Sequence, residues 1–172
     1  MSFSITFYNS GNDENCEILV KAVHNRNILG KLKNLHLSGI LSIEELKGYF
    51  TIHVKSYHEK NIWLICSGKD ISPYYSFIKS YPVVKYRIIH GIGTSKEFYD
   101  KDAYATGKYI FCTSRDVSGN FIGRVTYCID KAVYDMESLY FPFDSYRMID
   151  ESYDILISKG VKNDLIKSDG YF

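Results

Sequence analysis

Apolar residues recur at helical spacing through much of the first half of the chain. They return every three or four positions over residues 14–29, which predicts an amphipathic helix. A second helix is predicted from Ser42, because Ser42 and Glu45 form a capping box and an apolar face follows them. The first half of the chain is therefore expected to be mainly helical.

A third helix is predicted to begin at Ser72. Pro73 suits the first helical position, and Pro82 ends the helical pattern. The run 61–66 before it is short and apolar, and it fits either a strand or a helix.

After Pro82 the pattern changes to short runs rich in β-branched and aromatic residues, separated by turn-forming residues. Helices followed by strands, rather than an alternation of the two, are typical of an α+β protein. We expect one domain over residues 1–172, with a mainly helical part (1–82) packed on a mainly β part (83–172). The predicted strands cover residues 83–90, 107–113, 121–129, 132–135, 153–158 and 162–166.

Composition and charge restrict the class of protein only broadly. The 172 residues carry a formal net charge of +1, which gives no argument for a nucleic-acid or membrane partner. The four cysteines are widely spaced and are expected to be reduced thiols. No stretch has the length of a membrane span and the N-terminus carries no export signal. We therefore expect a cytoplasmic protein, in a host cytosol if it is viral or injected.

Arg87 is the most unusual residue of the β-rich part, because it lies inside an apolar, β-branched run. A guanidinium is costly to desolvate without a partner, so Arg87 requires either an acidic side chain or an anionic ligand. The turn that follows, residues 91–95, contains two glycines and could supply backbone amides to a phosphate. The alternative is an edge-strand arginine paired with a surface carboxylate.

Two other clusters have the chemistry of a site. Thr113 and Ser114 end the second predicted strand, where their hydroxyls could meet a ligand or satisfy a local turn. Asp150, Glu151 and Asp154 lead into the predicted strand 153–158, so one of these carboxylates is expected to face other elements. The histidines have no metal-ligand spacing, and no metal site is expected.

Taken in order, these pieces resemble mono-ADP-ribosyltransferases of the arginine, serine, glutamate class, particularly the small phage-encoded kind that modifies host proteins. Residues 86–87 are similar to the aromatic-Arg strand of that family, residues 111–114 to its Ser-Thr-Ser strand, and residues 150–160 to its Glu-x-Glu turn and following strand. The sequence departs from the family at Ile88, at Cys112 and in lacking a true Glu-x-Glu.

The resemblance implies a split, mainly antiparallel sheet and a cleft for NAD, which is used as a substrate without a metal. Arg87 would hold the pyrophosphate, and Ser114 and the strand backbone would hold the nicotinamide ribose. Thr113 is a further candidate for binding NAD. Glu151 or Asp154 would stabilise the oxocarbenium-like transition state. The partner would be a target macromolecule, expected to be a protein.

A related transferase class carries a His-Gly strand and a Gly-x-Tyr-x-Phe strand beside the nicotinamide. His90, Gly91 and Tyr109 match those motifs, so they are further candidates for binding NAD.

Two other functions stay open at this point. The chain could be a non-enzymatic interaction or inhibitor protein, or a small-ligand sponge, whose tyrosine-rich surface serves recognition. It could also be a nucleotide-processing enzyme that uses His90 and the turn at residues 91–95 on phosphates.

Overall fold

Five parallel strands form one sheet in the order β4-β3-β2-β1-β5. They are β1 (Ile62–Ser67), β2 (Tyr86–Ile92), β3 (Tyr109–Thr113), β4 (Phe121–Ile122) and β5 (Leu139–Phe143). The computed structural model describes residues 7–10, 12–20, 34, 36, 38, 39, 52, 59–132 and 135–168.

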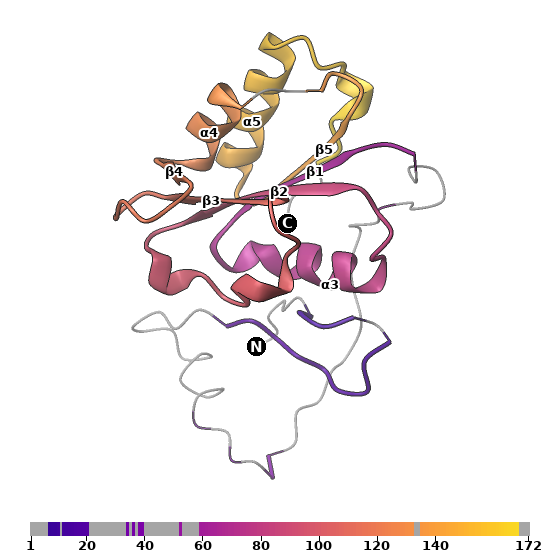
Figure 1. Ribbon diagram of the computed structural model, residues 1–172, viewed down its shortest axis with the longest axis vertical. Coiled ribbons are helices and arrows are strands. Elements are labelled where there is room, and N and C mark those ends of the chain that lie inside the picture. Colours follow the sequence, from indigo (N-terminus) through magenta and orange to yellow (C-terminus); the bar gives the residue numbers. More distant parts are fainter. Residues whose placement is uncertain are drawn as a thin grey trace.

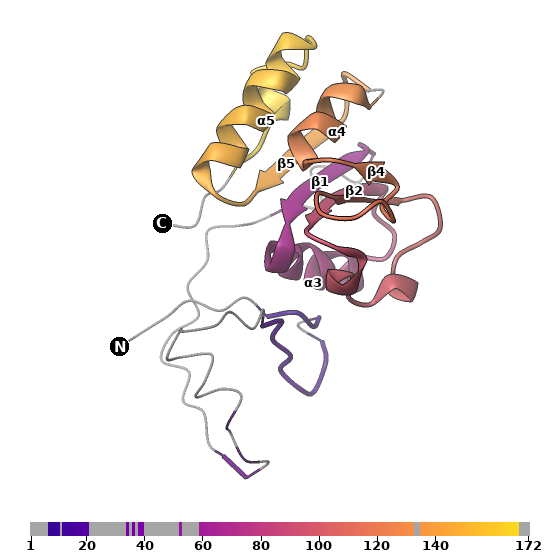
Figure 2. The same ribbon diagram turned by 90° about the vertical axis from the view of Figure 1, so that its left-hand side faces the viewer.

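Helices cover both faces of this sheet. Helix α3 (Ser72–Ser80) lies on one face, and α4 (Val125–Lys131) and α5 (Tyr146–Ser158) lie on the other (Figure 1). The described segment near the N-terminus lies on the α3 side (Figure 2), where Tyr8 stacks on Tyr75 with ring centroids 4.0 Å apart. The architecture is therefore three layers, α/β/α, with the sheet in the middle.

The central strands are buried on both faces, as parallel strands between two helix layers must be. In β1, the five residues from Ile62 to Cys66 are each at most 4% exposed. Parallel neighbours need a crossover, and α3 supplies it between β1 and β2.

The direction of winding reverses at β1. From β1 the chain passes through α3 to β2 and on to β3 and β4, whereas α4 carries it back to β5 on the other side of β1. The connections that leave β1 and β5 therefore run to opposite faces of the sheet (Figure 1). In open α/β sheets, ligands bind beyond the carboxyl ends of the strands at such a switch point.

The expected α+β architecture is wrong, because every strand pairing in the described sheet is parallel and the α-helices α3 and α4 lie between strands along the chain. A mainly antiparallel, split sheet was the fold that the transferase resemblance implied. The resemblance therefore fails at the level of the fold. The extent of the domain, residues 1–172, stays a prediction.

Some predicted elements are confirmed. The helix predicted from Ser72 is α3, and the predicted strands 83–90 and 107–113 overlap β2 and β3. The undecided run 61–66 is β1, at the centre of the sheet.

Two predicted strands are helices instead. Residues 121–129 form a strand only at Phe121–Ile122 and then enter α4, and residues 153–158 belong to α5. The burial pattern gives the reason. In α4 the buried residues are 125, 126, 128 and 129, and in α5 they are 149, 152 and 156, which are helical spacings.

The N-terminal helix predictions are tested only in part. Residues 14–20 of the first helix are not helical, and Ile18 instead forms an antiparallel bridge with Phe7. The rest of that helix, nearly all of the capping-box helix, and residues 133–134 lie outside the described residues. The last predicted strand, 162–166, is a 3-10 turn over Asn163–Leu165 followed by one parallel bridge from Ile166 to Tyr140.

Candidate functional site

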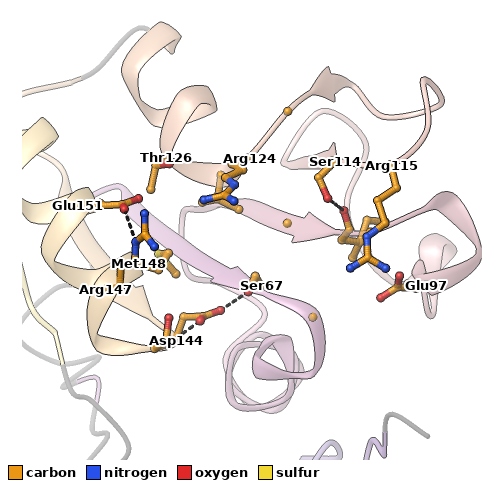
Figure 3. A pocket seen from close by; sticks show the side chains of 17 residues that line it. Ser67, Glu97, Ser114, Arg115, Arg124, Thr126, Asp144, Arg147, Met148 and Glu151 are labelled. Carbon is orange, nitrogen blue, oxygen red and sulfur yellow. Dashed lines mark hydrogen bonds and ion pairs between the residues drawn. The ribbon is translucent and has the colours of Figure 1, made fainter. Parts of the chain in front are cut away.

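A hollow of about 340 Å³ lies at the carboxyl edge of the sheet, where β1, β2, β3 and β5 end and α4 and α5 begin (Figure 3). Its position is the switch point of the fold. The lining residues come from five separate stretches of the chain: 67–68, 91–97, 114–115, 123–126 and 144–151.

Glycine at position 91 lets α4 approach β2. A Cβ added to Gly91 would lie 2.4 Å from Cγ2 of Val125, the first residue of α4, and 3.3 Å from Cβ of Ser67. The start of α4 therefore packs directly against the backbone of β2. This contact brings the polar residues that flank Val125, Arg124 and Thr126, to the side of the hollow.

His90 supports the turn after β1 through a hydrogen bond, and it does not line the hollow. Gly68 adopts a φ of +54°, a left-handed conformation that glycine adopts readily. Its carbonyl oxygen lies 2.7 Å from Nε2 of His90, and Nδ1 of the same ring contacts the hydroxyl of Tyr109. Burial lowers the pKa of His90 to about 4, so the ring is neutral: Nε2–H donates to Gly68 and Nδ1 accepts from Tyr109.

The loop after β3 is fixed against the end of β2. The backbone amide of Arg115 donates to the carbonyl oxygen of Gly93 at 2.8 Å, and that of Ser114 donates to Ile92 at 3.1 Å. Asp116 then accepts hydrogen bonds from the amide of Ser95 at 2.7 Å and from the hydroxyl of Ser118 at 2.7 Å. These bonds hold the pKa of Asp116 well below its usual range.

Cations and carboxylates alternate around the hollow, with Arg115, Arg124 and Arg147 facing Glu97, Asp144 and Glu151 (Figure 3). Arg147 and Glu151 form an ion pair at 2.8 Å along α5. The hydrogen bond from Arg147 lowers the pKa of Glu151, and the nearby charge of Arg124 lowers it further.

Arg115 and Arg124 differ from Arg147 in their ion pairs. Within the part of the chain that the structure describes, neither guanidinium forms an ion pair with a carboxylate. The Arg115 side chain extends along the hollow toward Glu97 (Figure 3). Both guanidinium groups are therefore available to an anionic ligand.

Asp144 marks the β5 end of the hollow. The hydroxyl of Ser67, at the end of β1, donates a short hydrogen bond to Asp144, and the amide of Ser145 donates another. The bond from Ser67 connects the ends of β1 and β5 at the place where the winding reverses.

Comparison with known proteins gives structural matches only. No protein-family model and no curated protein sequence matches the chain. A ferredoxin NADP+ reductase from Neisseria gonorrhoeae, solved with bound FAD and NADP, superposes with a TM-score of 0.70 at 10% identity, over 98% of this chain and 79% of that one.

Two further solved structures show a similar fold. Ferredoxin-NADP+ reductase from Plasmodium falciparum with 2'P-AMP gives a TM-score of 0.71 at 18% identity, over 97% of this chain and 76% of that one. The CS-b5R domains of human Ncb5or in the NAD+ form give 0.74 at 14% identity, over 95% of this chain and 54% of that one.

The chain shares the Rossmann-like fold of these reductases. At these identities the similarity establishes the fold and not the activity. It also overturns the transferase hypothesis, because a doubly wound parallel sheet has no counterpart to the split antiparallel sheet that ADP-ribosyl transfer required. The expected ADP-ribosyltransferase activity is therefore withdrawn, together with the expectation of a phage effector.

The candidate residues from the sequence are distributed over three places. Gly91, Ser114 and Glu151 line the hollow. His90, Tyr109 and Thr113 do not line the hollow but contact residues next to it. His90 and Tyr109 support the Gly68 turn, and Thr113 Oγ1 donates to the carbonyl oxygen of Asp116 at 2.9 Å.

Arg87 and Asp154 lie away from the hollow. Arg87 is the second residue of β2, at the opposite edge of the sheet, with its guanidinium carbon 5.4 Å from the centre of the Trp63 ring. Asp154 is exposed on α5. The convergence of Arg87, Ser114 and an acid that the transferase hypothesis needed is not found.

Sequence reasoning missed Ser67 and every charged residue of the lining except Glu151, namely Glu97, Arg115, Arg124, Asp144 and Arg147. One signal was present. Ser67 ends an apolar run and is followed by Gly68 and then by a helix with Pro73 at its start, which is the order of a strand, a tight turn and a helix. Arg115 likewise lies two residues after the end of a strand.

Among the described residues, no helix is both long enough and apolar enough to cross a membrane. The same residues contain no group of three or more histidine, cysteine, aspartate or glutamate side chains arranged to hold a metal ion.

Proposed function

We propose that the chain binds a pyridine dinucleotide, NADP(H) in preference to NAD(H), as the NAD(P)H-binding domain of a flavin-dependent reductase. The observation that carries the proposal is the hollow at the switch point, where Ser114 and Arg115 follow the end of β3 and two glycines, Gly91 and Gly93, lie at the end of β2. The compared reductases, which share this fold, were solved with NADP, 2'P-AMP or NAD+.

The β3 end of the hollow suits the phosphorylated adenosine ribose. Arg115 presents a planar guanidinium, whose fork of donors matches a phosphate, and it has no ion pair with a described carboxylate. Ser114 is exposed beside it and supplies a hydroxyl. The hydrogen bonds of this loop to Gly93 and Ser95 fix the backbone of both residues before a ligand arrives.

The glycine-lined middle suits the pyrophosphate. Gly68 and Gly91 line the hollow without side chains, so a phosphate can approach the backbone closely. His90 holds the Gly68 turn in place without entering the hollow. Its role in this proposal is positioning.

The positions of the carboxylates favour one orientation of the dinucleotide in the hollow. Asp144 would repel a phosphate, whereas it can accept from the carboxamide N–H of an uncharged nicotinamide. Glu97, the carboxylate at the β3 end, lies beside the Arg115 guanidinium, whose positive charge offsets its own. We therefore assign the β5 end to the nicotinamide and the β3 end to the adenosine. A reductase of this kind also uses a flavin as hydride acceptor, and the described residues are assigned here to the pyridine nucleotide alone.

Of the functions predicted from the sequence, binding of a small ligand is closer to this proposal than ADP-ribosyl transfer is. The predicted use of NAD is kept, as binding of NAD or NADP. A macromolecular partner, which the sequence also suggested, stays a prediction. It would be a protein that exchanges electrons with the complete reductase.

Calorimetric titration of the full chain with NADPH and with NADH tests the proposal. Arg115→Gln should weaken NADPH binding about 10- to 100-fold, since a charge-assisted hydrogen bond is worth about 1.5 to 3 kcal/mol, and should change NADH binding much less. Lys131→Gln, which removes an exposed cation from α4, is the matched control. Binding of neither dinucleotide would refute the proposed function, and equal losses for both would refute the assignment of Arg115.

A further inference from the structure

A second hollow, of about 290 Å³, lies at the amino edge of the sheet. Its lining comes from the starts of β1, β2 and β3: Asn61, Lys85, Tyr86, Arg87, Thr106, Gly107 and Lys108. Strand β2 spans residues 86–92, so its start and its glycine-rich end are about 20 Å apart at 3.3 Å per residue. The second hollow is therefore separate from the proposed dinucleotide site.

Three cations line this second hollow, and two of them are held over aromatic rings. The guanidinium carbon of Arg87 lies 5.4 Å from the ring centre of Trp63, which is 4% exposed, and Nζ of Lys108 lies 5.0 Å from the ring centre of Tyr86. A cation over an aromatic face is attracted by the ring and restricted in its orientation. Each cation is thus drawn toward its own ring at the amino edge of the sheet, and Arg87 remains exposed to solvent.

No carboxylate neutralises these cations in the described part of the chain. None of the seven lining residues is acidic, and Lys85, Arg87 and Lys108 are absent from every described ion pair. Asp135, an acid in contact with the lining residue Asn61, accepts from the side chain of Asn61 and from Glu137 and Ser138 in its own turn. The acidic partner that would explain Arg87 on its own is therefore not found there.

We propose that this basic hollow binds a compact phosphate-bearing anion, such as a polyphosphate or a phosphate monoester. The fork of Arg87 matches two phosphate oxygens, and Lys85 and Lys108 add two further positive charges to the lining of the same hollow. The concave shape and small volume suit a compact ligand. A protein partner would instead need an interface of about 1,000 Å² or more.

Inorganic pyrophosphate is the probe, titrated into the full chain by calorimetry. Because pyrophosphate can also enter the dinucleotide site, the titration is done in an Arg115→Gln background, which leaves the amino edge unchanged. Arg87→Gln and Lys108→Gln should each weaken the remaining binding at least tenfold. Lys131→Gln removes one exposed cation elsewhere and should change it less than twofold. Thermal unfolding confirms that each variant is folded.

Three outcomes overturn the proposal. The first is an absence of pyrophosphate binding in the Arg115→Gln background. The second is a loss with Arg87→Gln no greater than that with Lys131→Gln. The third is equally tight binding of a short polyglutamate peptide, which would indicate an acidic protein segment as the ligand. None of these results bears on NADPH binding at the carboxyl edge, so the two proposals fail separately.

Discussion

His90 donates a hydrogen bond from Nε2 to the carbonyl oxygen of Gly68, at 2.7 Å. The bond joins the middle sheet strand β2 to the turn that leaves β1 and lines the proposed dinucleotide site. The ring is 1% exposed and its other nitrogen contacts Tyr109, so a proton added to the ring would be both buried and without an acceptor. The turn therefore depends on a neutral histidine.

The neutral state of His90 predicts a loss of stability in mild acid. Burial lowers its pKa from 6.5 to about 4 in the folded state. Between these values the unfolded chain binds a proton that the folded chain does not, so the free energy of unfolding should fall as the pH drops from 6.5 to 4, by about 3 kcal/mol in total. Urea unfolding at a series of pH values measures this slope.

His90→Gln is the matched variant for that measurement. Glutamine cannot titrate in this range, so its unfolding free energy should lack the part of the slope that His90 contributes, although other groups still titrate. An unchanged slope in His90→Gln would show that the histidine is not buried in the neutral form.

Gly91→Ala should separate α4 from β2. The added Cβ would lie 2.4 Å from Val125, inside a packed contact, so the helix must move. Overpacking of this kind costs about 1 to 3 kcal/mol of stability. Because α4 begins at the hollow, NADPH affinity should fall as well. Denaturant unfolding and calorimetric titration measure the two effects.

Gly93→Ala is the control for this substitution. Its Cβ would meet Oε1 of Glu97, also at 2.4 Å, but that atom is the end of a flexible side chain that can rotate away. We expect a stability change well below that of Gly91→Ala. Equal destabilisation by the two variants would contradict the close packing of α4 on β2.

Asp116→Ala should weaken NADPH binding several-fold with little effect on overall stability. Its carboxylate ties the loop after β3 to Ser95, and this connection fixes Arg115 beside Gly93. The exposed Asp164→Ala, in the 3-10 turn after α5, is the control. If both variants bind NADPH as tightly as the unchanged chain, the loop does not need Asp116 to hold Arg115.

The same carboxylate predicts a pH dependence of binding. Hydrogen bonds hold the pKa of Asp116 below its unfolded value, so their contribution to the loop is complete above that value and is lost as the pH falls through the folded pKa. NADPH affinity should therefore keep this contribution near neutral pH and lose it only in strong acid. A loss of the Asp116-dependent part of the affinity near pH 6 would contradict this network.

Local signals in the sequence predicted some elements well. Pro73 and Pro82 bracket α3, and the β-branched run around Ile88 is β2. The run that forms β1 stayed undecided, because five consecutive apolar residues without a period fit a buried strand and a buried helix equally. Helix α4 was predicted as a strand because Val125, Tyr127 and Ile129 favour strands intrinsically, while burial on one helix face decided the outcome.

The sheet topology could not be predicted in this way. Whether neighbouring strands are parallel depends on where the intervening helices pack, and one of those helices, α4, had been predicted as a strand. The same error affected the site. Arg87 and Gly91 belong to one strand, but they lie near its opposite ends and therefore at opposite edges of the sheet. Only the direction of each strand in the sheet shows that Gly91, and not Arg87, lies at the same edge as Ser114.

Hydrogen exchange of the full chain with and without saturating NADPH tests the central claim most directly. The account predicts slower exchange at the carboxyl edge, in residues 67–71, 91–97 and 113–116, with no change at residues 85–87 and 105–108. Protection confined to the amino edge, or an unchanged pattern at a concentration that saturates binding, would contradict a dinucleotide site at the switch point.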